Sequence, residues 1–415
     1  MELMKGYKQT EVGVVPGDWN LEELGDCLLS HPKYGIGAAA SSYNDALPTY
    51  LRITDISEDG KFIHENKSSV NHTNSHEYIL ENGEIVFART GASVGKSYLY
   101  NISDGILIYA GFLIKVKPDP SKLNSYFLKN IVTTKHFWNW IGMVSMRSGQ
   151  PGINSNQLNS FILPIPPIKE QNAIAQALLD TDRYITGLEK LIEKKHQIKQ
   201  GAMQELLKPK VGWEVKKLGD LGACLRGVSY NPERDLYSFD ELNTIRLLRS
   251  NNIQNSKIDT NGLQFVDKLR VKRHQIIQDN DIIICMANGS KQLVGKAAKF
   301  KNNSNLDYTY GAFMGCFRTD ANIADSSFVY YNFLTNSYRN YIDVLLSGSS
   351  INNLNPKNIE SIEICLPRIE VQKEISETLL NFDLEIDLLN EKIEKAKSLK
   401  QGMMQNLLTG KIRLI

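Results

Sequence analysis

The chain has 415 residues, of which 42% are hydrophobic and 23% are charged, so it is long enough for more than one domain with its own core. Lysine and arginine total 48 and aspartate and glutamate total 46, which gives a formal charge of +2. This balance excludes a uniformly cationic, histone-like protein, whereas a local basic patch remains compatible with nucleic-acid binding.

The sequence shows no signal for membranes or secretion. No apolar run reaches the roughly 18 residues that a membrane-spanning helix needs, and the N-terminal residues lack the hydrophobic core of a signal peptide. The five cysteines include no Cys-x-x-Cys pair, which argues against a disulfide scaffold and a cysteine zinc site. We therefore expect a cytoplasmic protein with reduced thiols and no membrane contact.

The first part of the chain, about residues 12–165, has a mixed pattern. Runs of β-branched and aromatic residues predict strands at 83–88, 106–109 and 112–116, and an amphipathic stretch predicts a helix over 125–140. The regular strand–helix alternation of a doubly wound sheet is absent. The pattern therefore predicts an α+β fold.

A long helix is predicted next. Prolines up to Pro167 prevent an earlier start, and Pro209 follows its end. Its apolar residues alternate spacings of four and three, which is the seam of a coiled coil, with Thr181, Lys195 and Lys199 as polar interruptions. The apolar seam positions are Ile174, Leu178, Ile185, Leu188, Ile192 and Leu206.

The second half repeats this order. Residues 212–365 are again mixed, with a strand predicted at 281–286 and a helix at 326–346. A second seam helix follows Pro367 and ends before Gly410, with Lys400 as its polar interruption. Each helix has about 38 residues and spans about 57 Å. The apolar seam positions here are Ile375, Leu379, Ile386, Leu389, Ile393 and Leu407.

The two halves are copies of one unit. Residues 171–211 align without a gap on residues 372–412, and 18 of the 41 positions are identical. Residues 19–26, 94–96 and 109–112 recur more loosely in the second half, and we also pair Ile153-Asn154 with Ile351-Asn352. Two such copies most simply pack their seam helices antiparallel about a pseudo-twofold axis. The alternative is that each helix docks on its own globular domain.

Motifs for catalysis and cofactor binding are absent from the sequence. Residues 91–97 resemble a phosphate-binding loop, but three residues separate the glycines where four are needed, and five separate them in the repeat. We expect a glycine turn, either purely structural or also in contact with DNA. His72 and His76 lie in a polar loop, so we expect no metal site, and no catalytic residue is assigned.

Two stretches have side chains suited to nucleic acid. Residues 268–274 form a basic run, for which a solvated surface is the alternative, and residues 147–154 combine arginine, glutamine and asparagine, the usual readers of guanine and adenine. The candidate DNA-binding residues are Arg89, Thr90, Ser93, Lys96, Arg147, Gln150 and Asn154 in the first half, and Lys272, Arg273, Asn288, Lys291, Gln292, Lys296 and Asn352 in the second.

Over essentially its whole length the chain resembles the specificity (S) subunit of Type I restriction–modification systems. Each motif of this resemblance is weak alone, and the order of the motifs with their duplication is specific. They lie at residues 7–19, 148–154, 163–171 and 204–207, and again at 212–220, 366–372 and 405–411. The second copy has Ser349-Ser350 where the first has Gln150-Pro151, so contacts of Gln150 do not transfer to it.

The resemblance implies two target recognition domains, residues 1–165 and 211–365, and two conserved helical spacer regions, residues 166–210 and 366–415. Each domain would read one half of a split, asymmetric target in double-stranded DNA, and the helices would set the gap. Two methyltransferase (M) subunits would dock on the helices and methylate adenine N6 with S-adenosylmethionine bound to them, and motor-nuclease (R) subunits would join for cleavage. This chain would bind no cofactor and catalyse nothing. The alternatives are a coiled-coil adaptor without a DNA role and an enzyme with unrecognised motifs.

Overall fold

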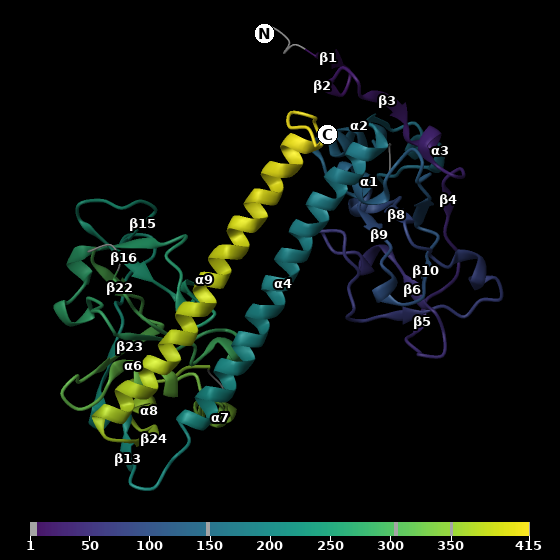
Figure 1. Ribbon diagram of the computed structural model, residues 1–415. Helices are drawn as coiled ribbons and strands as arrows, with labels where there is room; N and C mark the ends of the chain where they lie inside the picture. The colour runs from purple at the N-terminus through teal and green to yellow at the C-terminus, as the bar shows by residue number, and fades with distance from the viewer. Residues whose placement is uncertain (1–5, 147–149, 303–305, 349–351, 415) are drawn as a thin grey trace. The chain divides into compact units, whose positions relative to one another are not determined.

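The computed structural model describes residues 6–146, 150–302, 306–348 and 352–414 (Figure 1). The chain divides into two compact units, Met1–Glu189 with Glu391–Ile415, and Lys190–Asn390. Each unit therefore holds one globular region, together with one half of each long helix. We call residues 6–166 the first globular region and residues 211–367 the second.

The first globular region is built on two four-stranded sheets. One has the order β4-β11-β8-β9 and is antiparallel, and the other has the order β10-β6-β7-β5, in which β10 and β6 run parallel. Two short ladders, β1-β2 and β3-β12, complete it. The bounds are β1 Tyr7–Thr10, β2 Gly13–Pro16, β3 Asn20–Glu23, β4 Lys33–Tyr34, β5 Ser41–Ser42, β6 Thr49–Leu51, β7 Ser68–Ser69, β8 Ile85–Ala88, β9 Ser97–Leu99, β10 Leu107–Tyr109, β11 Leu113–Val116 and β12 Ile162–Ile165.

The second globular region repeats this topology. Its sheets have the orders β14-β23-β20-β21 and β15-β19-β16-β22, with β16 and β22 parallel, and β13 pairs with β24 as β3 pairs with β12. The duplication inferred from the sequence is therefore a duplication of strand order. The bounds are β13 Glu214–Lys217, β14 Gly222–Arg226, β15 Leu236–Tyr237, β16 Thr244–Leu248, β17 Ile253–Gln254, β18 Lys257–Ile258, β19 Gln264–Asp267, β20 Ile282–Cys285, β21 Ala297–Lys299, β22 Tyr308–Tyr310, β23 Met314–Thr319 and β24 Glu363–Leu366.

The predicted strands at 83–88, 106–109, 112–116 and 281–286 are confirmed as β8, β10, β11 and β20. The helix predicted over 125–140 is wrong as a single element, because α1 (Ser125–Ile131) and α2 (Lys135–Val144) are separate. The Thr134 side chain accepts a hydrogen bond from Phe137 N and starts a new helix. The helix predicted over 326–346 divides in the same way into α6 (Ser326–Asn332) and α7 (Asn336–Ser347), with Thr335 as the cap. The shorter helices are α3 Ser155–Asn159, α5 Leu218–Leu221 and α8 Pro356–Glu360.

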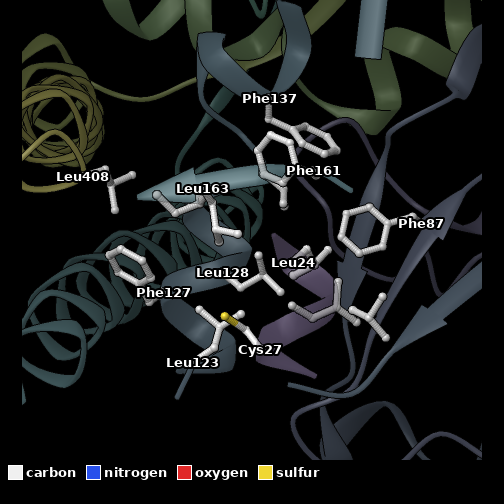
Figure 2. Packing of buried hydrophobic residues seen from close by; sticks show 14 of the residues in the cluster. Leu24, Cys27, Phe87, Leu123, Phe127, Leu128, Phe137, Phe161, Leu163 and Leu408 are labelled. Carbon is white, nitrogen blue, oxygen red and sulfur yellow. The ribbon is translucent and has the colours of Figure 1, made fainter. Parts of the chain in front are cut away.

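Each globular region has one core between its two sheets, another beneath its helices and a third, smaller cluster. In the first region the second of these cores includes Trp19, Leu24, Phe87 and Phe161, all of them fully buried. Figure 2 shows Leu163 of β12 and Leu408, just after the last long helix, turned toward this same cluster. The end of the chain therefore packs on the globular region that begins it.

The long helices are α4 (Ile168–Leu206) and α9 (Ile369–Leu407), which are uninterrupted in Figure 1. Both begin just after the prolines and end just before Pro209 and Gly410, as predicted. Within the first unit, Thr181 contacts Met403 and Asp182 contacts Lys400, so the residue number rises on one helix while it falls on the other. The halves of α4 and α9 in this unit are therefore antiparallel.

The second unit contains the same arrangement. Lys195 pairs with Glu385 at 2.7 Å and Lys199 with Asp383 at 2.5 Å, again in antiparallel order. The seam residues Ile174, Leu178, Ile185, Leu188, Ile375, Leu379, Ile386, Leu389, Ile393 and Leu407 are buried, and Ile192 and Leu206 are half-buried. The polar seam positions thus pair across the helices, and the apolar ones exclude water between them.

Candidate nucleic-acid interface

Two loops that are far apart in the sequence meet at the end of β8. Thr90 forms a bridge with Gly152, and Ile153 N donates to Arg89 O at 2.9 Å. Gly91 N donates to Pro151 O at 3.0 Å. The structure therefore brings Arg89, Thr90 and Ser93 close to the segment of Gln150 and Asn154. Arg147 lies outside the described residues.

The second globular region brings the corresponding loops together. Ala287 forms a bridge with Asn353, Asn288 N donates to Asn352 O at 3.4 Å, and Leu354 N donates to Met286 O at 2.8 Å. Asn288 and Asn352, two of the sequence candidates, are thereby neighbours. Lys272, Arg273, Lys291 and Gln292 are exposed on turns of the same globular region.

These contacts correct the proposed pairing of Ile153-Asn154 with Ile351-Asn352. Asn154 caps α3 by accepting from Gln157 N, and Asn355 caps α8 by accepting from Asn358 N. Asn355 is therefore the structural counterpart of Asn154. The repeated Ile-Asn dipeptide misled the comparison, because the loop before each short helix differs in sequence and the helix cap gives the true register.

Asn154 therefore has a structural role that does not depend on DNA binding, because it caps α3. Its side-chain oxygen holds Gln157 N at 2.8 Å, while Gln157 Oε1 accepts from Asn154 N at 3.0 Å. This reciprocal pair is a capping box. The capping box fixes the direction in which the segment at 150–154 enters α3.

Lys96 and Lys296 are also tied to their own globular regions. Lys96 Nζ donates to Glu58 at 2.6 Å and to Ile56 O at 3.4 Å, and Lys296 Nζ donates to Ile253 O at 2.8 Å. The repeated Val-Gly-Lys sequence has a packing reason as well. Gly295 has φ +86°, and a Cβ there would lie 3.1 Å from a side-chain carbon of Ile342. The predicted glycine turn is thus present in both copies.

Arg89 is held over an aromatic ring. Its guanidinium lies 4.5 Å from the centroid of the Tyr34 ring, and its Nε is buried without a hydrogen-bond partner within the described ranges. Its backbone N donates to Phe112 O at 3.0 Å. A stacked guanidinium that retains unused donors is suited to a base edge or a phosphate.

Two exposed phenylalanines occupy the same turn in the two globular regions. Phe112 lies between β10 and β11 with 63% of its surface exposed, and Phe313 lies between β22 and β23 with 70% exposed. Phe313 O accepts from Met286 N at 2.9 Å, as Phe112 O accepts from Arg89 N. Each ring therefore stands beside the strand end that presents the polar candidates. The sequence offered a signal for both, because residues 109–112 recur at 310–313.

A pocket of about 690 Å³ opens at this place in the second globular region. Arg249, Tyr230 and Phe313 line it together with Asn288 and Asn352. Arg249 was not among the candidates from the sequence, because β16, which precedes it, lies far from residues 288 and 352 along the chain. Amides, an aromatic ring and a guanidinium around one hollow are groups that bind nucleobases.

The described residues hold no group of three or more His, Cys, Asp or Glu side chains placed to bind a metal ion. None of the helices in the described part of the chain combines the length and the apolarity that crossing a membrane requires. The assignment of the individual DNA-binding candidates, and the four-part division of the chain, stay predictions.

The model of one protein family, the Type I restriction modification DNA specificity domain, matches the chain twice, at residues 32–200 and 210–398. Among curated proteins, the chain is 24% identical over 435 residues to the Type I restriction enzyme MjaVIII specificity subunit of Methanocaldococcus jannaschii, covering 99% of this chain and 96% of that protein. These matches extend over both repeats.

Solved structures share the fold. The S subunit of a Type I restriction–modification system from M. genitalium superposes with a TM-score of 0.60 at 14% identity, covering 98% of each chain. A chain solved in work on complex assembly and conformational transition of the type I R-M system gives 0.57 at 15% identity, covering 96% of this chain and 99% of that one. The chain therefore belongs to the Type I restriction modification DNA specificity domain family, and it is a specificity subunit with two such domains.

Proposed function

We propose that each DNA specificity domain of this chain reads one half of a split, asymmetric sequence in double-stranded DNA. The observation that carries this proposal is the twofold match of the family model, with one copy on each globular region and its following helix. The two copies share strand order but differ in sequence in the loops at residues 150–154 and 352–355. A constant scaffold with different loops is what two readers of different sequences need.

The clustering of the polar candidate residues indicates which surface of each globular region binds DNA. In each globular region the end of one central strand, β8 or β20, places unlike loops and one exposed phenylalanine side by side. Arginine, asparagine and glutamine distinguish bases, while the exposed Lys272, Arg273 and Lys291 are suited to phosphates. We therefore propose this strand end as the surface that faces DNA.

We also propose that α4 and α9 set the gap between the two half-sequences and bind the methyltransferase subunits. Exposed apolar residues on the helices support docking, because water-facing leucines at helical spacing are typical of a surface that a partner helix covers. In α9, Leu384 and Leu388 are 60% and 59% exposed and lie one turn apart, and Leu399 is 62% exposed. Tyr184 and Ile198 of α4 are also exposed.

In this proposal the chain supplies recognition, and its partners supply chemistry. The methyltransferase subunits would carry S-adenosylmethionine and methylate adenine N6, and motor-nuclease subunits would join the same assembly in the cytoplasm. The structure solved in work on complex assembly of the type I R-M system is similar to this chain, which supports assembly with such subunits. No step of catalysis is assigned to residues of this chain.

The test is a methylation map. This chain is expressed with the methyltransferase subunit of its own system, and the DNA is sequenced for modified adenines. We expect a motif of two half-sequences separated by a gap, present only when both chains are made. A soluble complex that modifies no specific sequence would contradict the proposal, and so would modification by this chain alone.

A further inference from the structure

Arg52 and Arg249 hold the same place in the two repeats. Arg52 follows β6 and Arg249 follows β16, the strands that pair in parallel with β10 and β22. Each arginine begins a short 3-10 turn, η2 (Ile53–Asp55) or η6 (Ser250–Asn252). Each backbone N donates to the third residue of its turn, at 2.8 Å to Asp55 and at 3.0 Å to Asn252. The two arginines are therefore structural equivalents.

Their side chains have different partners. Arg52 makes two hydrogen bonds to the Asp55 carboxylate, from Nε at 2.9 Å and from Nη2 at 2.7 Å. Position 252 has an asparagine instead, which keeps the backbone bond but carries no charge. Its own Nδ2 donates to Asp259 O at 2.9 Å. Arg249 Nε is buried and, within the described ranges, has no hydrogen-bond partner.

Arg249, whose Nε is unpaired, belongs to the wall of the 690 Å³ pocket. The described residues that line this pocket include no aspartate or glutamate, so no lining group neutralises Arg249. Asn288 and Asn352 line the same hollow, and Phe313 stands at it with 70% of its surface exposed. A guanidinium that lines a pocket without a carboxylate partner gains free energy from a ligand that brings acceptor atoms.

We propose that Arg249 reads a guanine in the half of the target that the second DNA specificity domain binds. Guanine presents O6 and N7 side by side in the major groove, and these two acceptors match the fork of a guanidinium. A concave pocket with amides and an aromatic ring fits the edge of a flat base better than it fits a phosphate, for which exposed Lys272 and Lys291 stand on the surface. This inference rests on the proposed function.

The replacement of Asp55 by Asn252 is then the change that turns a structural arginine into a reader. In the first globular region the arginine at this place stabilises the turn, and among the described residues Arg89, stacked on Tyr34, has an unpaired Nε. The two domains would thus present their arginines from different strands. Because the two arginines would project from different strands, the two domains would prefer different bases although they share one scaffold.

The experiment compares Arg249→Gln with the matched variant Arg52→Gln, each in the full chain with its methyltransferase subunit. We expect Arg249→Gln to lose the preference for guanine at one position of one half-sequence by roughly 10- to 100-fold, with the other half unchanged. Arg249→Lys keeps the charge but not the fork, and we expect it to relax the same position. Arg52→Gln should lower the melting temperature and leave the methylated motif as it was.

Three results would overturn the inference while leaving the proposed function intact. They are an unchanged motif in Arg249→Gln, a half-sequence of the second domain without guanine, and a uniform loss of affinity with a salt slope reduced by about one, which marks a phosphate contact. If Arg249→Gln does not fold, the unaltered complex is tested on DNA with 7-deazaguanine, which lacks N7. Weaker binding at one guanine supports the inference, and equal binding at all of them overturns it. A wild-type complex without any sequence preference would instead overturn the proposed function.

Discussion

Lys400 of α9 pairs with Asp182 of α4 at 2.7 Å, and the equivalent residues Lys199 and Asp383 pair at 2.5 Å with the helices exchanged. Each aspartate also accepts a hydrogen bond from a tyrosine of the globular region in its own unit, Asp182 from Tyr126 and Asp383 from Tyr331. Both lysines occupy seam positions, Lys400 as the polar interruption of its seam and Lys199 as one of three in the other. A charged seam residue with one matching partner favours one register and one orientation of the helices over the others.

We expect Asp182→Asn to lower the free energy of unfolding by about 1–3 kcal/mol, because it removes the partner of Lys400 and the charged acceptor of Tyr126. Urea denaturation measures the change. Asp180→Asn is the matched control, since Asp180 is exposed and its contact with Arg183 is 3.5 Å long. That control should change stability by less than about 0.5 kcal/mol. Equal effects of the two variants would contradict the role given to the half-buried pair of Asp182 and Lys400.

The same pair predicts a pH dependence. Burial by itself raises the pKa of Asp182, but hydrogen bonds from Lys400 and Tyr126 outweigh it and hold the pKa below its ordinary value of 3.8. The stabilisation is therefore complete above pH 3.8 and is lost as the pH falls through the lower pKa of the folded state. The difference in unfolding free energy between wild type and Asp182→Asn should stay level from pH 7 to about pH 5 and shrink below about pH 4. A difference that grows toward low pH would disprove this.

Arg413 ties the end of the chain to its beginning. It donates to Glu170 at 2.6 Å and to Asp18 at 2.7 Å, and Trp19 Nε1 donates to the same Glu170 at 3.1 Å. Glu170 is buried, so Arg413→Ala leaves a poorly compensated carboxylate and should cost about 3 kcal/mol of unfolding free energy. Lys411→Ala, at an exposed position two residues away, is the control. An equal decrease in melting temperature for both variants would argue against this stabilising role of Arg413.

The length of the helices should set the gap in the DNA target. Deletion of residues 188–194 and 389–395 removes one heptad from each helix and spares the pairs of Asp182 with Lys400 and Lys199 with Asp383. The helices shorten by about 10 Å, the length of about three base pairs. A methylation map should show the same two half-sequences with a shorter gap. An unchanged gap in an active complex would refute the measuring role of the helices.

The exposed phenylalanines should contribute to DNA binding and not to folding. We expect Phe112→Ala and Phe313→Ala each to weaken binding of the target by roughly 5- to 100-fold, which corresponds to about 1–3 kcal/mol for an aromatic contact to a base. Because both rings are mostly exposed, the melting temperature should hardly change. Leu242→Ala, at a position 99% exposed, is the control for removing a surface side chain. Loss of stability without loss of affinity would show that the rings serve packing alone.

Parts of the fold were predictable because their signals are local. The seams of α4 and α9, their starts after prolines and the strands β8, β11 and β20 follow from spacing and residue type within a few turns or a few strand positions. The breaks before Lys135 and Asn336 escaped prediction, although Thr134 and Thr335 cap the new helices. A threonine inside an amphipathic stretch resembles a helix residue until its hydrogen bond is seen.

The candidate site was less predictable, because the sequence gives a side chain's type but not its partner. Lys96 and Lys296 read as free cations but donate to carbonyls about 40 residues away. Asn154 read as a base contact but caps α3. No sequence pattern around Arg249 marked it as a candidate for DNA binding. Comparison with Arg52 would have shown only that Asn252 replaces the acidic Asp55.

By itself, the sequence determined that this protein is a duplicated α+β chain with two seam helices, and the order of its repeated motifs pointed to the specificity subunits. Periodicity and helix caps depend on residues close together in the sequence, and an internal repeat is found by comparing residue types alone, so all three can be recognised without a structure. Only the tertiary structure decided that Arg52 is paired with Asp55 while Arg249 Nε has no partner among the described residues, where the two phenylalanines lie, and which lysine pairs with which aspartate. Those outcomes depend on hydrogen bonds and burial between residues that lie tens to hundreds of positions apart, and such contacts exist only once the chain has folded.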